Sequence, residues 1–163
     1  MKATTRVTQR LSALAAALAA ATLAAVPAAA DPPERPIILN LVNQHSGLCL
    51  TATDASQSFA VLQLPCNGSY AQKWQSEWLW PYMMDLQHGR CLTALPGTSA
   101  LQTTECSWKR PGQPRDPKQD WAYDGGSAPT KFANGGLCLG VLPGNSWARR
   151  LDCNTGPAVT WYR

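Results

Sequence analysis

The chain has 163 residues, of which 45% are hydrophobic and only 15% are charged, and its formal net charge is +4. Three of its 14 basic residues, Lys2, Arg6 and Arg10, lie at the N-terminus, so residues 31–163 hold 11 basic side chains against 10 acidic ones. A net charge of about +1 gives no argument for nucleic-acid binding, and we expect no nucleic-acid partner.

Residues 1–30 have the pattern of a secretory signal peptide. The basic start precedes a run of Leu, Ala, Val and small residues at 11–26, and residues 28–30 offer a small-residue cleavage site before Asp31. A membrane anchor is the alternative, but a span needs about 20 strongly apolar residues, and this run is short and mostly Ala. We therefore expect cleavage near Ala30, secretion, and no membrane association afterwards. A leader of this style is typical of a bacterium.

Residues 31–163 suit one domain, with a Pro-rich lead-in at 31–36 and three repeats at about 37–79, 80–125 and 126–163. Short apolar and β-branched runs between Gly, Pro and Asn turns predict strands, and no long window has helical periodicity. The predicted strands span 37–42, 49–53, 60–64 and 74–78, then 83–86, 91–94 and 100–104, and finally 131–133, 138–141, 147–151 and 159–162. This pattern predicts an all-β, barrel-like fold.

One motif recurs in all three repeats, which makes the repeat the main organising feature of the chain. Each copy opens with Gly-x-Cys-Leu, continues to a second Cys and closes on Trp, which Gln precedes by two positions in the first two copies. The copies are Gly47, Cys49, Leu50, Cys66, Gln72 and Trp74; Gly89, Cys91, Leu92, Cys106, Gln119 and Trp121; and Gly136, Cys138, Leu139, Cys153, Val159 and Trp161. The second repeat carries about seven additional residues within 107–118.

Six cysteines in a small exported domain predict disulfides. A zinc site is the alternative, but it would need short Cys-x-x-Cys pairs, so we expect neither a metal nor another cofactor. Six cysteines allow 15 pairings, and the repeat selects the one that treats the three copies alike. That pairing is Cys49–Cys66, Cys91–Cys106 and Cys138–Cys153.

Four strands alone bury little apolar surface, so three repeats arranged around a pseudo-threefold axis are predicted to share one core. The closing tryptophans would point inward beside the Leu that follows each first Cys, because a buried Trp contributes 150–250 Å² of buried area as a typical range. Trp78, Trp80, Tyr82 and Trp147 lie outside the closing motifs, and the sequence does not show whether they are exposed.

With its three spaced copies of Gly-x-Cys-Leu, Cys and Gln-x-Trp, the chain resembles a small secreted bacterial member of the ricin B-type lectin family over residues 37–163. Val159 departs from the family's Gln in the third copy. The resemblance implies a β-trefoil of three four-stranded repeats with pseudo-threefold symmetry and one disulfide per repeat. It also implies up to three shallow sugar sites, and hence a polysaccharide or glycan as the partner.

A typical family site uses an Asp two residues after the first Cys, an aromatic residue near the second Cys, and an Asn before Gln-x-Trp. In this chain the Asp position holds Thr51, Thr93 and Gly140. The aromatic position holds Leu64, Thr104 and Leu151, and the Asn position holds Ala71, Lys118 and Ala158. Only Gln72 and Gln119 match. A neutral hydroxyl accepts hydrogen bonds less strongly than a carboxylate, so the usual sugar sites are predicted to be partly degenerate.

The candidate carbohydrate-binding residues are therefore Thr51, Asp54, Gln72, Thr93 and Gln119. Each has a structural alternative: the Gln side chains could lock local backbone, the Thr residues suit ordinary strands, and Asp54 suits a turn. The third repeat is predicted to serve as scaffold only.

We expect no enzymatic activity, because the acids are scattered and no nucleophile motif is present. His45 and His88 occupy similar turn positions, which indicates shared turn geometry rather than catalysis. A second hypothesis is a protein-binding or enzyme-inhibitory β-trefoil that acts through the loop at 108–118. Trp108, Lys109, Arg110 and Arg115 are its candidate interface residues, since Trp and Arg are favoured anchors.

Overall fold

Short antiparallel strands and 3₁₀ turns make up the computed structural model, which describes residues 36–76, 81–107, 114–123 and 129–163. The first repeat contributes β1 (Ile37–Asn40), β2 (Val42–Asn43), β3 (Cys49–Ala52), β4 (Val61–Leu64) and β5 (Lys73–Ser76). The second contributes β6 (Met84–Asp85), β7 (Cys91–Ala94), β8 (Leu101–Thr104) and β9 (Ala122–Tyr123). The third contributes β10 (Phe132–Asn134), β11 (Leu137–Val141), β12 (Ala148–Leu151) and β13 (Trp161–Tyr162).

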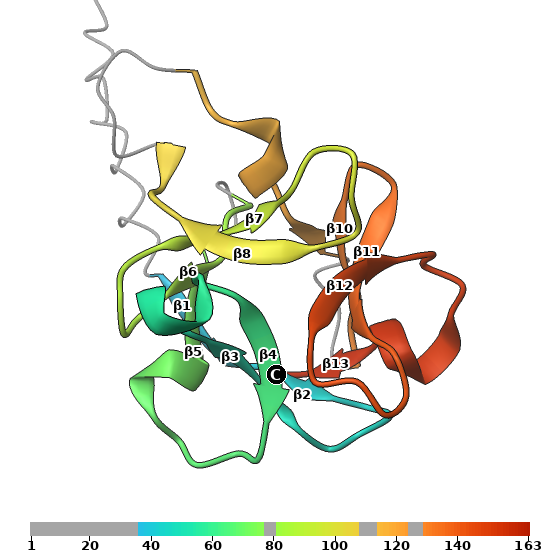
Figure 1. Cartoon of the computed structure of the whole chain (residues 1–163). Coiled ribbons are helices and arrows are strands. Elements are labelled where there is room, and N and C mark those ends of the chain that lie inside the picture. The colour runs from blue at the N-terminus through green and yellow to red at the C-terminus, as the bar shows by residue number, and fades with distance from the viewer. Residues whose placement is uncertain (1–35, 77–80, 108–113, 124–128) are drawn as a thin grey trace, which may run out of the picture. The chain divides into compact units, whose positions relative to one another are not determined.

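The last strand of each repeat pairs with the first part of the next repeat. β5 pairs with β6, β9 pairs with β10, and β13 returns to pair with β2, all antiparallel. This pairing links the three repeats into a closed cycle (Figure 1). The predicted β-trefoil is thereby confirmed.

The three hairpins β3–β4, β7–β8 and β11–β12 meet at one end of this cycle, where β4, β8 and β12 converge in the middle of Figure 1. Equivalent backbone hydrogen bonds join them in a circle. Gln63 N–H donates to Ser146 O at 2.7 Å, Thr103 N–H to Phe59 O at 2.8 Å, and Arg150 N–H to Ser99 O at 2.7 Å. Each hairpin edge is therefore satisfied by the neighbouring repeat rather than by water.

The core confirms the prediction made from the motif. Trp74, Trp121 and Trp161 are fully buried, and so are Leu50, Leu92 and Leu139. Each indole N–H donates to the carbonyl of the paired Leu, at 3.0, 2.9 and 2.9 Å respectively. A buried indole N–H without an acceptor would cost free energy, so these three bonds make the Trp–Leu pair a self-contained unit of the repeat.

The disulfides also follow the predicted pairing. Cys49–Cys66, Cys91–Cys106 and Cys138–Cys153 each have a Cα–Cα distance of 5.0 Å. Cys49 and Cys91 begin β3 and β7, and the partner cysteine follows the end of β4 or β8. Each bond closes a loop of about 15 residues, which removes chain entropy worth about 3 kcal/mol from the unfolded state.

Several predicted strand bounds were wrong. The predicted strand 159–162 begins only at Trp161, because Gly156–Val159 forms the 3₁₀ turn η5. The predicted strand 37–42 is interrupted at Leu41, since β1 pairs with β5 whereas β2 belongs to the sheet of β13 and β3. The predicted strand 83–86 is shorter in the structure, as β6 (84–85), and 131–133 is shifted by one residue, as β10 (132–134). The predicted strand 147–151 starts one residue later, at Ala148.

Some predictions concern residues outside the described part of the chain. The signal peptide at 1–30, Trp78 and Trp80, and the loop residues Trp108, Lys109 and Arg110 belong to this group. In the ranges that are described, no helix has the length and apolar character needed to cross a membrane.

Candidate functional site

Gln72 of the first repeat is the last residue of the 3₁₀ turn η2 (Tyr70–Gln72), which leads directly into β5. Its Nε2 donates to Thr51 Oγ1 at 3.1 Å and to Pro65 O at 2.9 Å, and its Oε1 accepts from Asn67 N–H at 2.8 Å. The Gln side chain is 99% buried, with a relative exposure of 1%. The structure thus brings the two predicted residues Thr51 and Gln72 into direct contact.

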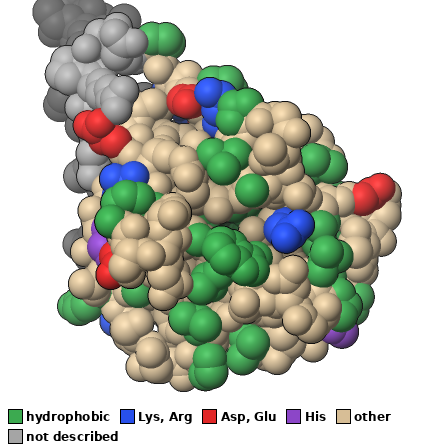
Figure 2. All heavy atoms as spheres, viewed as in Figure 1, with side chains coloured by type: hydrophobic (Ala, Val, Ile, Leu, Met, Phe, Trp, Pro, Cys, Tyr) green, Lys and Arg blue, Asp and Glu red, His purple; other side chains and the backbone are tan. Residues whose placement is uncertain are grey.

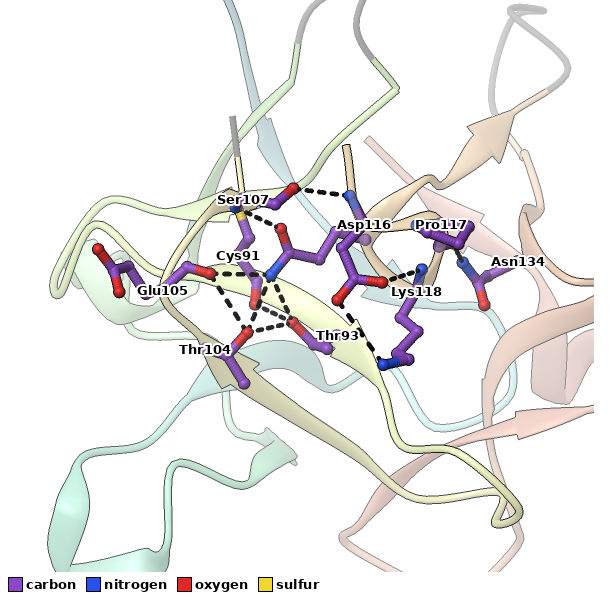
Figure 3. Close-up of polar contacts among 10 residues, drawn as sticks. Cys91, Thr93, Thr104, Glu105, Ser107, Asp116, Pro117, Lys118 and Asn134 are labelled. Atoms are coloured by element: carbon purple, nitrogen blue, oxygen red, sulfur yellow. Dashed lines mark hydrogen bonds and ion pairs between the residues drawn. The ribbon is translucent and has the colours of Figure 1, made fainter. Parts of the chain in front are cut away.

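Gln119 of the second repeat lies in the equivalent turn η4 (Pro117–Gln119). Its Nε2 is 3.1 Å from Thr93 Oγ1, 2.9 Å from Thr104 Oγ1 and 3.0 Å from Glu105 O, and its Oε1 accepts from Ser107 N–H at 2.8 Å. Figure 3 shows that the side chains of Thr93 and Thr104 and the backbone of Glu105 point toward one another, and the hydrogen bonds place the Gln119 amide among them. Thr104 adds a hydroxyl that the first repeat lacks, because Leu64 stands in its place.

Each of the two Thr hydroxyls, Thr51 and Thr93, also makes a hydrogen bond to a backbone carbonyl. Thr51 Oγ1 donates to Cys49 O at 3.0 Å, and Thr93 Oγ1 donates to Cys91 O at 2.9 Å. Thr51 and Thr93 are themselves buried. The Thr–Gln pairs therefore form closed polar networks that hold each 3₁₀ turn against the strand beginning at the first cysteine.

The closed network predicts that Gln119→Leu lowers the free energy of unfolding by about 1–2 kcal/mol. The substitution leaves the partly buried Ser107 N–H and the buried Thr93 hydroxyl without their amide partner. Chemical denaturation followed by circular dichroism measures the change. Gln57→Leu is the matched control, because Gln57 is exposed and should stay within about 0.5 kcal/mol of wild type. Equal stability of the two variants would contradict the network.

The third repeat replaces the polar pair with an apolar one. Gly140 and Val159 stand where the first repeat has Thr51 and Gln72. A Cβ atom at Gly140 would lie 2.7 Å from Val159 Cγ1 and 2.9 Å from both Ala158 O and Leu151 Cδ1. The backbone of Gly140 has no left-handed φ, so this position needs glycine for space rather than for conformation.

Asp54 lies apart from the Thr51–Gln72 pair, at the hairpin turn between β3 and β4. It caps the 3₁₀ turn η1 (Ala55–Gln57), and its Oδ1 accepts from Ser56 N–H at 2.9 Å and from Ser56 Oγ at 2.5 Å. These hydrogen bonds, led by the one from the Ser56 hydroxyl, lower the pKa of Asp54 below its ordinary value. Within the described ranges, no hydrogen bond joins Asp54 to Thr51 or Gln72.

Arg115 is the one predicted loop residue that the structure describes. Its guanidinium pairs with Asp120 at 2.5 Å, and both side chains are partly exposed. The following residue, Asp116, is held by a hydrogen bond from its N–H to Ser107 Oγ at 3.0 Å. The described end of the loop is therefore anchored to the second repeat.

Tyr70 and Trp147, two of the exposed aromatic side chains in the described ranges, were not among the predicted site residues. Tyr70, 60% exposed, stands two positions before Gln72, with Lys73 Nζ 4.8 Å from the centre of its ring. Trp147, 49% exposed, precedes β12. The sequence contained a hint in both cases, because neither aromatic residue is repeated at the equivalent positions of the other two repeats.

The fold and the three motif copies define a β-trefoil protein. The family model of the ricin-type β-trefoil lectin domain matches residues 38–161, and the chain therefore belongs to that family. No curated protein sequence matches the chain.

Solved structures with the same fold share little sequence with it. The hemolytic lectin CEL-III matches with a TM-score of 0.65 and 19% identity, over 80% of this chain and 30% of CEL-III, so the chain spans less than a third of that protein. The designed threefold-symmetric protein ThreeFoil matches with a TM-score of 0.62 and 20% identity, over 77% of this chain and 96% of ThreeFoil. The β-trefoil lectin of Vibrio vulnificus hemolysin/cytolysin, with N-acetyl-D-lactosamine bound, matches with a TM-score of 0.59 and 17% identity, over 77% and 92% of the two chains.

Proposed function

We propose that the protein is a secreted, non-catalytic carbohydrate-binding module. The observation that supports this proposal most strongly is the match of a lectin-domain family over residues 38–161. A sugar in the structure of the Vibrio vulnificus β-trefoil lectin is consistent with the same class of partner.

The proposed sites lie on the first and second repeats. In each of them the Thr–Gln pair forms the floor, Thr51 with Gln72 and Thr93 with Gln119, and holds the 3₁₀ turn in place beside the site. Because these polar atoms already bond to one another, the direct contacts with sugar hydroxyls come from exposed groups around them. Asp54, at the hairpin turn apart from the pair, offers a carboxylate only to a glycan long enough to extend to that turn. The third repeat, with Gly140 and Val159, acts as scaffold.

Tyr70 is the proposed aromatic surface of the first site. The family's aromatic position holds Leu64, and the exposed ring of Tyr70 in η2 offers the flat apolar face that Leu64 lacks. Lys73 Nζ lies over one face of the same ring, 4.8 Å from its centre, and adds hydrogen-bond donors beside the stacking surface. This arrangement favours a shallow site that binds one sugar residue of a longer glycan.

A glycan array, followed by titration with cell-wall and plant polysaccharides, tests the proposal. We expect monosaccharide dissociation constants of about 1 mM, as for shallow sites that bury little of the ligand. Tyr70→Ala should weaken binding at the first site by about tenfold, because it removes the stacking surface. Tyr162→Ala, which removes another exposed ring, is the control. Absence of binding at millimolar sugar would overturn the proposed function.

A further inference from the structure

A depression of about 380 Å³ lies where the hairpins of the three repeats meet, away from the Thr–Gln pairs. All three repeats contribute to its lining, which includes Ser58, Thr98, Ser99, Gln102, Trp147 and Arg149. Figure 2 views this end of the molecule and shows hydrophobic side chains gathered at the centre, with a basic side chain next to them. A volume of this size is at the lower end of the range for small-molecule sites.

The repeats differ at two equivalent positions in the hairpins that surround the depression. Six residues before the second cysteine, the first and second repeats have Ala60 and Ala100, whereas the third has Trp147. Four residues before that cysteine, the repeats have Leu62, Gln102 and Arg149. Ala60, Ala100 and Trp147 all line the depression, so two of the three equivalent positions contribute a small side chain and the third an indole.

Isolated bridges hold these side chains at the junction. Ala60 pairs with Gln102, Ala100 pairs with Arg149, and Leu62 pairs with Trp147, each bridge joining two different repeats. The fold does not need a Trp at this position, since Ala60 and Ala100 make the equivalent connections in the other two hairpins. An exposed Trp that the scaffold does not require is a candidate binding residue.

The polar groups that line the depression are largely unused. In the part of the chain that is described, neither the half-buried guanidinium of Arg149 nor the side-chain amide of Gln102 has a hydrogen bond or an ion pair. Arg150 provides the contrast, because its guanidinium donates to Leu95 O at 3.2 Å and Thr98 O at 2.6 Å and supports the hairpin. No acidic side chain is among the lining residues, so the positive charge of Arg149 is not neutralised there.

We propose that this depression is an additional glycan site, which binds a pyranose ring carrying a carboxylate, that is, a uronic acid residue of a polysaccharide. The proposal rests on the proposed function, in that it assumes a glycan partner, but it uses none of the Thr–Gln residues. The indole face of Trp147 stacks on the apolar face of the sugar ring. Arg149 binds the carboxylate through paired N–H donors, and Gln102 hydrogen-bonds the hydroxyls.

The test compares trigalacturonate with the neutral galactose trisaccharide of the same linkage, by isothermal titration of the full secreted chain. Wild type should bind trigalacturonate about tenfold more tightly than the neutral trisaccharide, and added salt should reduce this preference. Trp147→Ala should weaken binding of both trisaccharides at this site by about tenfold. Arg149→Gln should remove the preference for the acid while the neutral trisaccharide binds as before.

Both variants should fold, because Ala60 stands at the position equivalent to Trp147, and Gln102 at the position equivalent to Arg149. Tyr70→Ala and Tyr162→Ala should leave trigalacturonate binding at this depression unchanged. If Trp147→Ala and Arg149→Gln bind trigalacturonate like wild type while Tyr70→Ala weakens glycan binding, the additional site is excluded and the proposed function stands. A wild-type preference for the neutral trisaccharide excludes a uronic acid as the ligand. Binding of no glycan by wild type overturns both proposals.

Discussion

Trp121→Ala should lower the free energy of unfolding by about 3–5 kcal/mol, the range for removing a fully buried Trp from a core. The indole has no exposed surface and packs in the common core with the other two closing tryptophans. The substitution also leaves Leu92 O without the 2.9 Å hydrogen bond from the indole N–H. A domain of this size has about 5–15 kcal/mol of stability in total, so a large fraction would be lost. Chemical denaturation with the disulfides intact measures it.

The same change at the surface is the control for this prediction. Trp147→Ala should alter the free energy of unfolding by no more than about 0.5 kcal/mol, because Trp147 is half exposed and alanine occupies its position in the other two repeats. Trp121→Phe should fall between the two, since it keeps an aromatic ring and loses the N–H donor. If Trp121→Ala and Trp147→Ala proved equally stable, the closing tryptophans would not be the centre of the core.

Gly140→Thr should destabilise the protein by about 2–3 kcal/mol, in the upper part of the range for overpacking. The added Cβ would come within 2.7–2.9 Å of Val159, Leu151 and the backbone carbonyl of Ala158, and a backbone atom cannot move aside as a side chain can. Differential scanning calorimetry or chemical denaturation measures the loss.

Gly140→Thr combined with Val159→Gln should be more stable than the sum of the two single losses predicts. The first repeat has Thr51, Leu64, Ala71 and Gln72 at the equivalent positions, and the double variant gives the third repeat the same four residue types. The new amide would have the hydroxyl at position 140 as its acceptor, as Gln72 has Thr51. A coupling energy of about 1–2 kcal/mol is expected from the double-mutant cycle. Additive losses from the two single variants would show that the third repeat differs by more than these two residues.

The candidate residues of the first two repeats were predictable because the motif aligns the repeats. Thr51 and Gln72 are 21 residues apart, and Thr93 and Gln119 are 26 apart. In both repeats, however, the Thr follows the first Cys by two residues and the Gln precedes the closing Trp by two. The sequence offered bonding to local backbone as an alternative role for both Gln side chains, and their hydrogen bonds agree with it. The 3₁₀ turns η2 and η4 that contain them were not predictable, because such short turns have no periodic pattern. A third turn of this kind, η5, includes Val159, which explains why the predicted start of the strand at 159–162 was wrong.

The sequence by itself determined the repeat architecture, the disulfide pairing and the buried Trp–Leu pairs. These features recur at regular spacing, so each copy restrains the interpretation of the other two. Only the tertiary structure decided which of the residues that differ between the repeats line the same depression. Gln102 and Trp147 are 45 positions apart and line the same depression because three hairpins from different repeats meet there. Spacing within one repeat carries no information on this arrangement, because the arrangement depends on how strands from all three repeats close into a ring.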